Sequence, residues 1–335
     1  MIPQSDLSWQ TQSWQEQMMN AIQQPDELLR SLGLAASDLN LSSKAAECFS
    51  VNVPQSFLSR ITPEDPLDPL LRQVLNLQLE DIQQPGYTAD PLDESNYNPI
   101  KGLVRKYKNR ALLIVTGKCA IHCRYCFRRN FPYAENNPSR NDWQQAFNYL
   151  REQPEIDEII LSGGDPMSAP DKHLLWLTNQ LSEIPSIKRL RFHTRLPVVI
   201  PDRVTPDFLE LLQSTRLSTT VVVHINHANE IDDAVSQSLL KIKTAANFLL
   251  NQSVLLAGVN DNLDTQIALQ EACVQAGVMP YYLHLLDSVM GAAHFQVPEA
   301  RVRKLYSEMQ ASLSGYMLPR LVIEEPGATS KQVFR

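Results

Sequence analysis

From residue 111 onward, the chain alternates between short apolar runs and longer amphipathic segments. The apolar runs have the length of strands, and they read ALLIVTG, EIILSGG, LRFHTR, TVVVHI, SVLLAG and YYLHLL. The segments that follow them predict helices, and they read NDWQQAFNYLRE, DKHLLWLTNQLSEI, TPDFLELLQS, DDAVSQSLLKIKTAANFLL, LDTQIALQEACVQAG and VPEARVRKLYSEMQASL. Near-continuous apolar strands that alternate with helices are typical of a parallel sheet covered by helices. The pattern therefore predicts an α/β fold, and both a doubly wound sheet and a barrel fit it.

Polar residues near the predicted strands favour the barrel. In a barrel of parallel strands, the chemistry lies at the C-terminal strand ends. Each predicted strand here is flanked or ended by a polar residue, and these residues are Thr116, Ser162, His193, His224, Gln252 and Asp287. We therefore expect these side chains to meet at one edge of a barrel.

Residues 1–110 have a different pattern, with short helical stretches and irregular segments. Residues 24–33 predict a short helix, because Pro25 stands at its start, acidic residues follow in the first turn and Gly33 ends it. Residues 70–82 predict a second helical run, and residues 83–99 are rich in turn-forming residues. We expect an N-terminal helical and irregular extension over 1–110, a barrel over 111–313 and a C-terminal segment over 314–335.

Composition excludes several classes of protein. The 335 residues include 30 Lys and Arg against 37 Asp and Glu, which gives a formal net charge of −7. An acidic chain is a poor match for a nucleic-acid binder that works by general attraction to phosphates. No apolar stretch reaches the roughly 18 residues of a membrane span, and the polar N-terminus lacks the pattern of a signal peptide. We expect a soluble cytoplasmic protein that binds neither membrane nor nucleic acid.

Three of the five cysteines lie within eight residues and follow the first predicted strand. Cys119, Cys123 and Cys126 have the spacing C-x3-C-x2-C, and three thiolates so close together can hold one iron–sulfur cluster while one corner keeps no protein ligand. One alternative is a structural zinc site with His122 as the fourth ligand, although zinc ligands usually come as two separate pairs. The other is three unrelated buried cysteines. The two remaining cysteines, Cys48 and Cys273, are expected to be small buried residues.

The cysteine motif, with Tyr125 before its last cysteine, resembles that of the radical S-adenosylmethionine (SAM) superfamily. The resemblance implies a partial (β/α)6 barrel of the TIM type, a [4Fe–4S] cluster on Cys119, Cys123 and Cys126, and SAM bound at the fourth iron. SGGDP, after the second strand, resembles the family's Gly-Gly motif, which holds the methionyl amino group. The resemblance implies further SAM-binding residues, namely Ser162, Gly163, Gly164, Asp165, His224 and Gln252.

Four stretches narrow the resemblance to lysine 2,3-aminomutases: CRYCFRR, LSGGDP, HINHANE and LLNQSVLLAGVND. These enzymes also use pyridoxal 5'-phosphate (PLP), which needs a lysine for its Schiff base and a polar site for its phosphate. Lys331, at the end of EEPGATSK, matches that lysine, although most of the family's glycines are replaced here by other small residues. Lys106, Tyr107 and Arg110 match the residues that bind the phosphate.

The same resemblance implies how L-lysine binds. Arg128 matches the arginine that binds the substrate carboxylate, and a guanidinium suits such a bidentate contact. Asp287 and Glu324 match the two acids that hold the ε-ammonium group, with Glu324 in place of the family's aspartate. A reductant for the cluster and association into oligomers are also implied.

The segments PDELLRSLGL and FRRNFPYAENN resemble the EpmB type, which makes (R)-β-lysine for attachment to elongation factor P through a lysine ligase. Catabolic aminomutases carry C-terminal cysteines that bind zinc, and this chain has no cysteine beyond Cys273, so we expect no zinc. Three alternatives stay open. They are a free-lysine 2,3-aminomutase of catabolism or antibiotic synthesis, an iron–sulfur electron carrier and a zinc-stabilised binding module.

Overall fold

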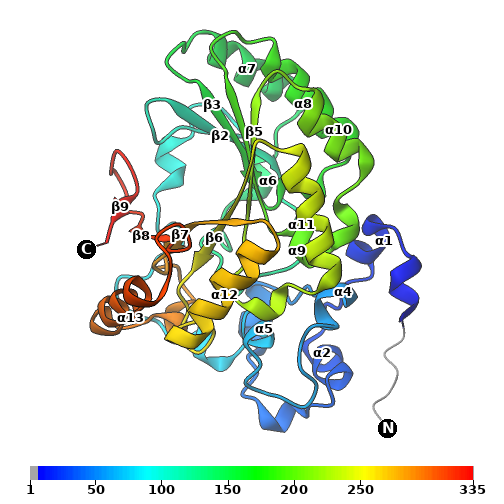
Figure 1. Ribbon diagram of the computed structural model, residues 1–335, viewed down its shortest axis with the longest axis vertical. Coiled ribbons are helices and arrows are strands. Elements are labelled where there is room, and N and C mark those ends of the chain that lie inside the picture. The colour runs from blue at the N-terminus through cyan, green and yellow to red at the C-terminus, as the bar shows by residue number, and fades with distance from the viewer. Residues whose placement is uncertain (1–6, 335) are drawn as a thin grey trace.

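One mainly parallel sheet forms the centre of the protein. The structure, a computed structural model, describes residues 7–334. Within these residues the sheet has nine strands, and each pairs with the next in chain order (Figure 1). Their bounds are β1 Leu103–Val104, β2 Arg110–Thr116, β3 Glu158–Gly163, β4 Arg189–Thr194, β5 Ser218–Val223, β6 Phe248–Val254, β7 Met279–His284, β8 Arg320–Ile323 and β9 Gln332–Val333. Strands β2 to β8 are parallel, while β1 and β9 pair antiparallel at the two edges.

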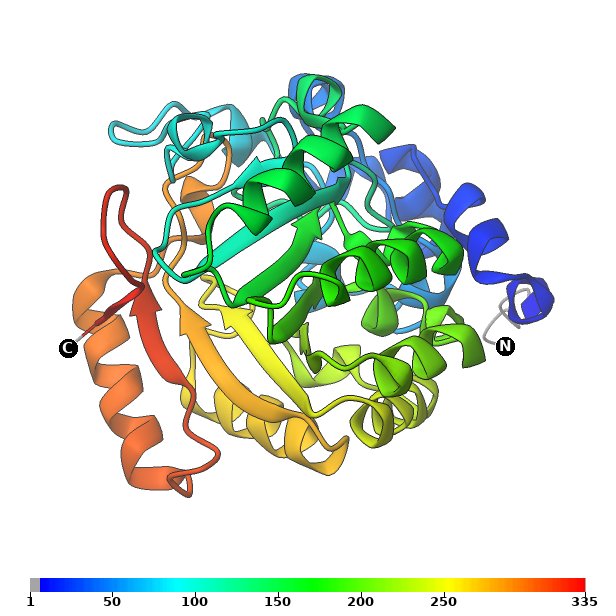
Figure 2. The ribbon, with the colours of Figure 1, turned by 90° about the horizontal axis from the view of Figure 1, so that it is seen from above.

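Helices cover the outer face of this sheet, and Figure 2 shows the strands curving side by side inside them. The helices are α1 Trp14–Met19, α2 Pro25–Ser31, α3 Ser43–Cys48, α4 Gln55–Leu58, α5 Pro69–Arg72, α6 Tyr133–Asn136, α7 Arg140–Arg151, α8 Asp171–Ser182, α9 Leu196–Val199, α10 Pro206–Ser214, α11 Asp233–Ala245, α12 Leu263–Gln275 and α13 Glu299–Ser312. Short 3-10 turns are η1 Leu7–Thr11, η2 Ala36–Asp38, η3 Gln78–Asp81, η4 Glu94–Tyr97, η5 Pro166–Ser168, η6 Pro201–Arg203, η7 Ala228–Glu230 and η8 Ala293–Phe295. None of the helices within residues 7–334 is both long enough and apolar enough to cross a membrane.

The sequential strand order decides between the two sheet types that the sequence allowed. A doubly wound sheet reverses its strand order at a switch point, whereas these strands never reverse. The pairings of the described strands leave β1 and β9 as edges, so the barrel is partial. The expected partial (β/α)6 barrel, formed by β2 to β7 and the helices after them, is confirmed.

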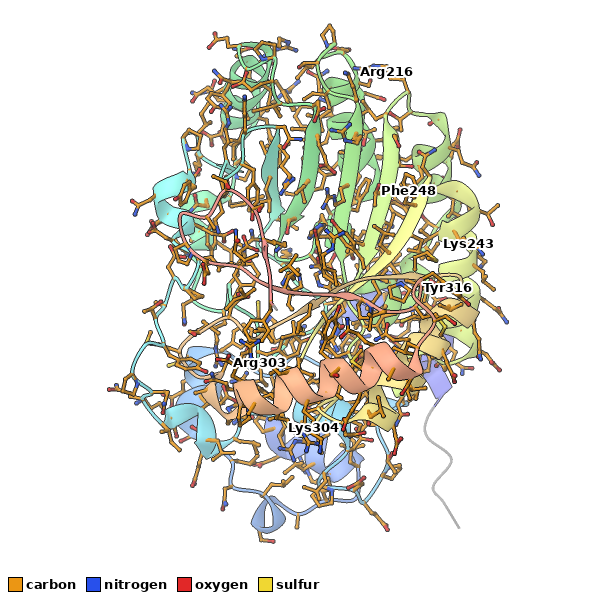
Figure 3. All side chains as sticks on the ribbon, turned by 60° about the vertical axis from the view of Figure 1, so that its left-hand side comes forward. Arg216, Lys243, Phe248, Arg303, Lys304 and Tyr316 are labelled. Carbon is orange, nitrogen blue, oxygen red and sulfur yellow. The ribbon has the colours of Figure 1, made fainter. Side chains whose placement is uncertain are left out.

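The predicted strand SVLLAG was wrong in its position. Strand β6 begins at Phe248 (Figure 3), and Phe248 and Leu249 pair with Thr220 and Val221 of β5. The sequence placed these apolar residues at the end of the preceding helix, but α11 ends at Ala245. Pairing with the neighbouring strand, which no local pattern reveals, decides where the strand begins.

The helix predicted over residues 70–82 was also wrong. Helix α5 ends at Arg72, and only the short turn η3 follows. Leu77 forms a bridge with Leu41 instead, and the Asn76 side chain donates a 2.6 Å hydrogen bond to the carbonyl of Ser42. These tertiary contacts outweigh the local helical preference. The helix predicted over residues 24–33 is α2, and Gly33 follows it with a φ of +70°.

The N-terminal extension and the barrel share one hydrophobic cluster. Leu28, Phe57 and Leu71 of the extension belong to the same cluster as Leu113 and Phe192 of the sheet. The helices α1 to α5 lie together beside the lower end of the barrel in Figure 1. The division at residues 110 and 313 stays a prediction, because this continuous core gives no independent boundary.

The extension also fixes the loop that carries the clustered cysteines. Glu80 binds Arg124 with hydrogen bonds of 2.8 and 2.6 Å, and it binds Arg129 at 2.7 Å. All three side chains are buried. Asn52 adds a 2.7 Å hydrogen bond to the carbonyl of Ala120, and the amide of Arg124 donates to the Gln73 carbonyl. Residues far apart in sequence therefore hold this loop from one side.

Replacing Glu80 with alanine is expected to lower the free energy of unfolding by about 3–5 kcal/mol, because two buried guanidinium groups lose their counter-charge. Urea denaturation followed by circular dichroism measures this change. The control is Glu308→Ala, which removes an exposed partner of Lys304 on α13 (Figure 3). We expect an effect below about 0.5 kcal/mol there. Equal effects of the two substitutions would show that the contacts of Glu80 with Arg124 and Arg129 do not stabilise the protein.

Candidate active site

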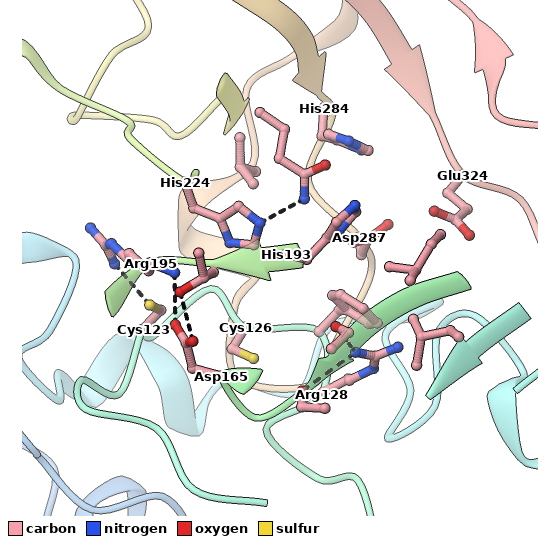
Figure 4. Close-up of a pocket in the computed structure, with 18 of the residues that line it drawn as sticks. Cys123, Cys126, Arg128, Asp165, His193, Arg195, His224, His284, Asp287 and Glu324 are labelled. Carbon is pink, nitrogen blue, oxygen red and sulfur yellow. Dashed lines mark hydrogen bonds between the residues drawn. The ribbon is translucent and has the colours of Figure 1, made fainter. Parts of the chain in front are cut away.

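A cavity of about 630 Å3 lies inside the curve of the sheet. Thr116 and His122, which the sequence also singled out, do not line it, but every residue to which the resemblance gave a role does. These are Lys106, Tyr107, Arg110, Cys119, Cys123, Cys126, Arg128, Ser162, Gly163, Gly164, Asp165, His224, Gln252, Asp287, Glu324 and Lys331. Figure 4 shows how several of them face one another across the cavity. The structure thus brings together side chains that come from seven strands and their following loops.

The three clustered cysteines line the cavity together, and none of them forms a disulfide. Burial raises the pKa of Cys126 to about 11, with a further contribution from Cys123, so binding as thiolates needs a strong positive charge nearby. Across the described part of the chain, no three His, Cys, Asp or Glu side chains converge on a point that suits one metal ion. A cubane cluster requires another arrangement, because each thiolate bonds a different iron.

His122, the fourth ligand of the zinc alternative, is not brought to the cavity. Its Nδ1 lies 2.8 Å from the carbonyl oxygen of Ser50, and its ring stacks on Phe49 at a centroid distance of 4.7 Å. His122 is absent from the residues that line the cavity. The structure therefore groups the three thiols without this imidazole.

The Gly163–Gly164 corner lies tightly against the loop that follows β2. Gly163 has a φ of +117°, which favours glycine. A Cβ on Gly163 would stand 2.6 Å from the carbonyl oxygen of Thr116, and one on Gly164 would stand 2.5 Å from that of Lys118. Glycine is therefore required at both positions, and both residues also line the cavity.

Asp165 connects this corner to the next strand. Its carboxylate accepts hydrogen bonds from the Thr194 hydroxyl at 2.7 Å and from three backbone amides, those of Met167, Arg195 and Leu196, at 2.7–3.0 Å. Burial raises the pKa of Asp165, and these hydrogen bonds oppose that effect. These contacts occupy the carboxylate. Asp165 therefore holds the end of β4 against the loop that follows β3, and so fixes this wall of the cavity.

His224 and Gln252 face each other within the cavity. Their Nε2 atoms lie 2.9 Å apart, and Gln252 Oε1 has no hydrogen-bond partner within the described residues. Burial, with smaller contributions from nearby arginines, lowers the pKa of His224 to about 3, so the imidazole is neutral at physiological pH. The pair therefore offers neutral polar groups to a ligand.

Arg128 is held by an acid that the sequence did not indicate. Glu94 of η4 accepts two hydrogen bonds of 2.7 Å from its Nε and Nη2, while Nη1 donates to the Ser162 hydroxyl at 2.9 Å. Both charged side chains are buried. Glu94 lies in the turn-rich part of the extension, where an acid gives no local signal of a site. With these contacts, Arg128 lines the cavity.

The opposite end of the cavity holds two acids and two lysines. Glu324 accepts a hydrogen bond from Lys106 at 3.2 Å and forms an ion pair with Lys331. Burial would raise the pKa of Glu324, but the two ammonium groups outweigh it and lower that pKa to about 2. Burial and the charge of Glu324 raise the pKa of Asp287 to about 7.

The phosphate-binding candidates lie next to this acid. The Tyr107 hydroxyl donates a 3.1 Å hydrogen bond to Glu324, and the Arg110 guanidinium lies 4.1 Å from the centre of the Tyr107 ring. Burial raises the pKa of Tyr107, so the phenol keeps its proton. Lys106, Tyr107 and Arg110 thus form one basic and aromatic corner of the cavity.

Three further lining residues are His193, which the sequence expected at this edge of the barrel, and Arg195 and His284, for which it suggested no role. The Nε2 atoms of both histidines are buried without a hydrogen-bond partner among the described residues. Burial lowers both histidine pKa values well below the ordinary range. A polar residue inside the apolar run YYLHLL was the one available signal for His284. Buried, unpaired nitrogens in a cavity indicate contacts reserved for a ligand.

Comparisons with known proteins agree with this geometry. Residues 113–248 match the family model described as the radical SAM superfamily. L-lysine 2,3-aminomutase of Escherichia coli (strain K12) is 48% identical over 96% of this chain and 94% of its own length. The Haemophilus influenzae L-lysine 2,3-aminomutase is 44% identical over 100% and 99%. The Clostridium subterminale enzyme of the same name is 31% identical over 98% of this chain and 78% of its own length.

The raised pKa of Asp287 predicts that stability depends on pH. Between pH 4 and pH 7 the folded protein binds more protons at Asp287 than the unfolded chain does, so this one group makes unfolding easier as the pH rises, whereas the buried histidines act in the opposite direction. The variant Asp287→Asn is expected to lack the Asp287 contribution, so its stability relative to the wild type should increase as the pH rises and should exceed that of the wild type at pH 7. Urea denaturation at several pH values between 4 and 7.5 measures the difference. Parallel pH curves for the two proteins would show that the Asp287 pKa is not raised.

Proposed function

Since this chain belongs to the L-lysine 2,3-aminomutase family of the radical SAM superfamily, we propose that it makes (R)-β-lysine for attachment to elongation factor P. The chain is an L-lysine 2,3-aminomutase, an isomerase that acts on L-lysine. Membership of the superfamily implies a [4Fe–4S] cluster and SAM. The role in modifying elongation factor P and the configuration of the product are the proposed parts.

Similarity along the whole chain supports the proposed role. The E. coli and H. influenzae relatives, which are EpmB-type enzymes, match over 94% and 99% of their own lengths. The C. subterminale relative has additional length that this chain does not match. Modification of elongation factor P would place the reaction in the cytoplasm.

One observation carries the assignment of site residues. Side chains suited to a cluster, to SAM, to PLP and to lysine line a single cavity, although they come from residues 106 to 331. The three thiols, the Gly163–Gly164 corner, and the unpaired nitrogens of His193 and His284 fit these groups. When bound, the cluster and SAM supply a carbon-centred radical that can remove hydrogen, and PLP supplies the carbonyl group that carries the migrating amine.

The two charged ends of the cavity match the two ends of lysine. The Arg128 guanidinium would bind the carboxylate, since Glu94 and Ser162 fix its orientation. Asp287 and Glu324 would bind the ε-ammonium group. Opposite charges at opposite ends of the cavity hold the substrate in one direction, so the same carbon atoms always face the reacting groups.

Lys331, which would hold PLP through its amine, forms an ion pair with Glu324. Its Nζ would therefore have to leave the carboxylate before it could hold PLP. Glu324, with a pKa of about 2, stays charged and is then available to the substrate ammonium group. The amine of Lys331 thus occupies the place that the substrate's ammonium group would take later.

The barrel region 111–313 would hold the cluster and SAM, while 314–335 would contribute Glu324 and Lys331. The extension 1–110 would contribute Lys106, Tyr107 and Arg110, and it also supplies Glu94. The proposed division is therefore one of function and not of separate cores.

The product assay tests the proposed function. The protein is reconstituted without oxygen with iron and sulfide and is then given dithionite, SAM, PLP and L-lysine. We expect (R)-β-lysine by chiral chromatography with mass spectrometry, and its transfer to elongation factor P when the lysine ligase is added. β-Lysine that the ligase does not transfer would indicate a free-lysine enzyme. A cluster-loaded protein that forms no β-lysine would reject the aminomutase assignment.

The variant Lys331→Ala is expected to lose PLP absorbance after gel filtration, because the covalent anchor is missing, and to form no β-lysine. Its iron and sulfide content should equal that of the wild type. Lys304→Ala, on the exposed face of α13, is the control and should keep both properties. PLP absorbance retained by Lys331→Ala would place the anchor at another lysine.

A further inference from the structure

The HINHANE segment, of which only His224 has a role above, leads to a buried arginine beside the cysteines. Its last residue, Glu230, is 0% exposed and binds the guanidinium of Arg195 at 2.8 Å. Arg195 follows β4 and is 4% exposed. Removing two charged groups from water costs free energy, so a buried ion pair next to a functional site indicates a role at that site.

Arg195 is in direct contact with one of the three thiols. Its Nη1 lies 2.8 Å from Cys123 Sγ, and Figure 4 shows the guanidinium beside this sulfur. Its Nη2 donates to Glu230 and, at 2.7 Å, to the side-chain oxygen of Gln73. The guanidinium therefore bridges the sulfur on one side and a carboxylate on the other.

The surrounding contacts fix this arrangement from both ends. Glu230 Oε1 accepts hydrogen bonds from the amides of Asn226 and His227, at 2.9 and 3.1 Å. The backbone amide of Arg195 donates to Asp165 at 2.7 Å. Asn226 donates in turn to the side chains of Gln73 and Tyr125. With both charged partners held in this way, neither can turn away from the sulfur easily.

We propose that Arg195 and Glu230 together set the reduction potential of the iron–sulfur cluster, through the contact of Arg195 with Cys123. This rests on the proposed function, in which Cys123 is a cluster ligand. Reduction adds one negative charge to the cluster, and hydrogen bonds and charges near its sulfurs shift the potential. The cation of Arg195 stabilises the reduced state and raises the potential, while the anion of Glu230 lowers it.

Because both side chains are buried, each has a large effect on the reduction potential. The rise caused by Arg195 and the fall caused by Glu230 do not cancel fully. Solvent screens charges weakly in the interior, so the partner that touches the sulfur acts more strongly than the one behind it. The pair therefore adjusts how readily the cluster accepts an electron, while the fold carries no net charge at this position. Arg195 and Glu230 are positioning residues, because they act on the cluster through Cys123.

Potentials of charge-changing variants test this proposal. The cluster of each reconstituted protein is titrated with a redox mediator and followed by electron paramagnetic resonance without substrate. Arg195→Gln is expected to lower the ratio of reduced to oxidised cluster at a fixed ambient potential at least tenfold, which corresponds to about 59 mV for one electron. Glu230→Gln, which can still accept from Arg195, should shift the potential in the opposite direction.

The double variant Arg195→Gln with Glu230→Gln restores the native net charge, so its potential should return toward that of the wild type. Arg216→Gln is the control, since this guanidinium (Figure 3) donates to the backbone carbonyls of Ser182, Ile184 and Ile187 and does not line the cavity, and its potential should equal that of the wild type. If Arg195→Gln takes up no cluster, Arg195→Lys and Glu230→Gln replace it in the test. The reduction potential of Arg195→Lys should shift slightly, and that of Glu230→Gln should rise.

Potentials of Arg195→Gln and Glu230→Gln that equal the wild type, or that shift in the same direction, would overturn this proposal. If Arg195 and Glu230 had a purely structural role, the variants would change the cluster content or the free energy of unfolding but not the reduction potential. A wild-type protein that takes up no reducible cluster would instead overturn the proposed function, and this proposal with it. The two failures are therefore distinguishable in one experiment.

Discussion

The cysteine loop is held in place by charge, and the rest of the site depends on this constraint. Arg124, Arg128 and Arg129 are buried within six residues of chain, and buried cations require anions in contact. The anions are Glu80 and Glu94, both of which come from the N-terminal extension. The extension is therefore a structural part of the site, since without its carboxylates the loop that carries the three thiols would be forced toward solvent.

Charge is sorted along the cavity. Arg128 with Glu94 stands at one end, and Lys331 with Glu324 stands at the other. The cavity is also lined by imidazoles that burial keeps neutral, because each would have to be charged in a place that excludes water. Charged groups of both signs, with neutral polar groups beside them, suit a substrate that carries a charge at each end.

The sequence predicted those features whose residues lie close together in the chain. The thiol trio and the Gly163–Gly164 corner were found because their members are adjacent, and the strands were found because apolar runs are local. Strand β6 was misplaced because its start depends on pairing with β5. Glu94 and Arg195 were missed because their partners lie 34 and 72 residues away in the chain. Contacts between distant segments leave no pattern in a single sequence, so the second layer of the site could not be predicted from it.

One of the two shortest strands of the sheet, β9, borders the cavity through Val333. Strand β9 follows Lys331 directly and is joined to β8 by just two residue pairs, Val322 with Val333 and Ile323 with Gln332. Both of its residues are exposed, and Phe334 beside them packs against a hydrophobic cluster. Because so few pairings hold this edge, its amides are expected to exchange hydrogen faster than those of the parallel strands behind it. Lys331 is thus attached to the part of the sheet whose backbone is held by the fewest strand pairings.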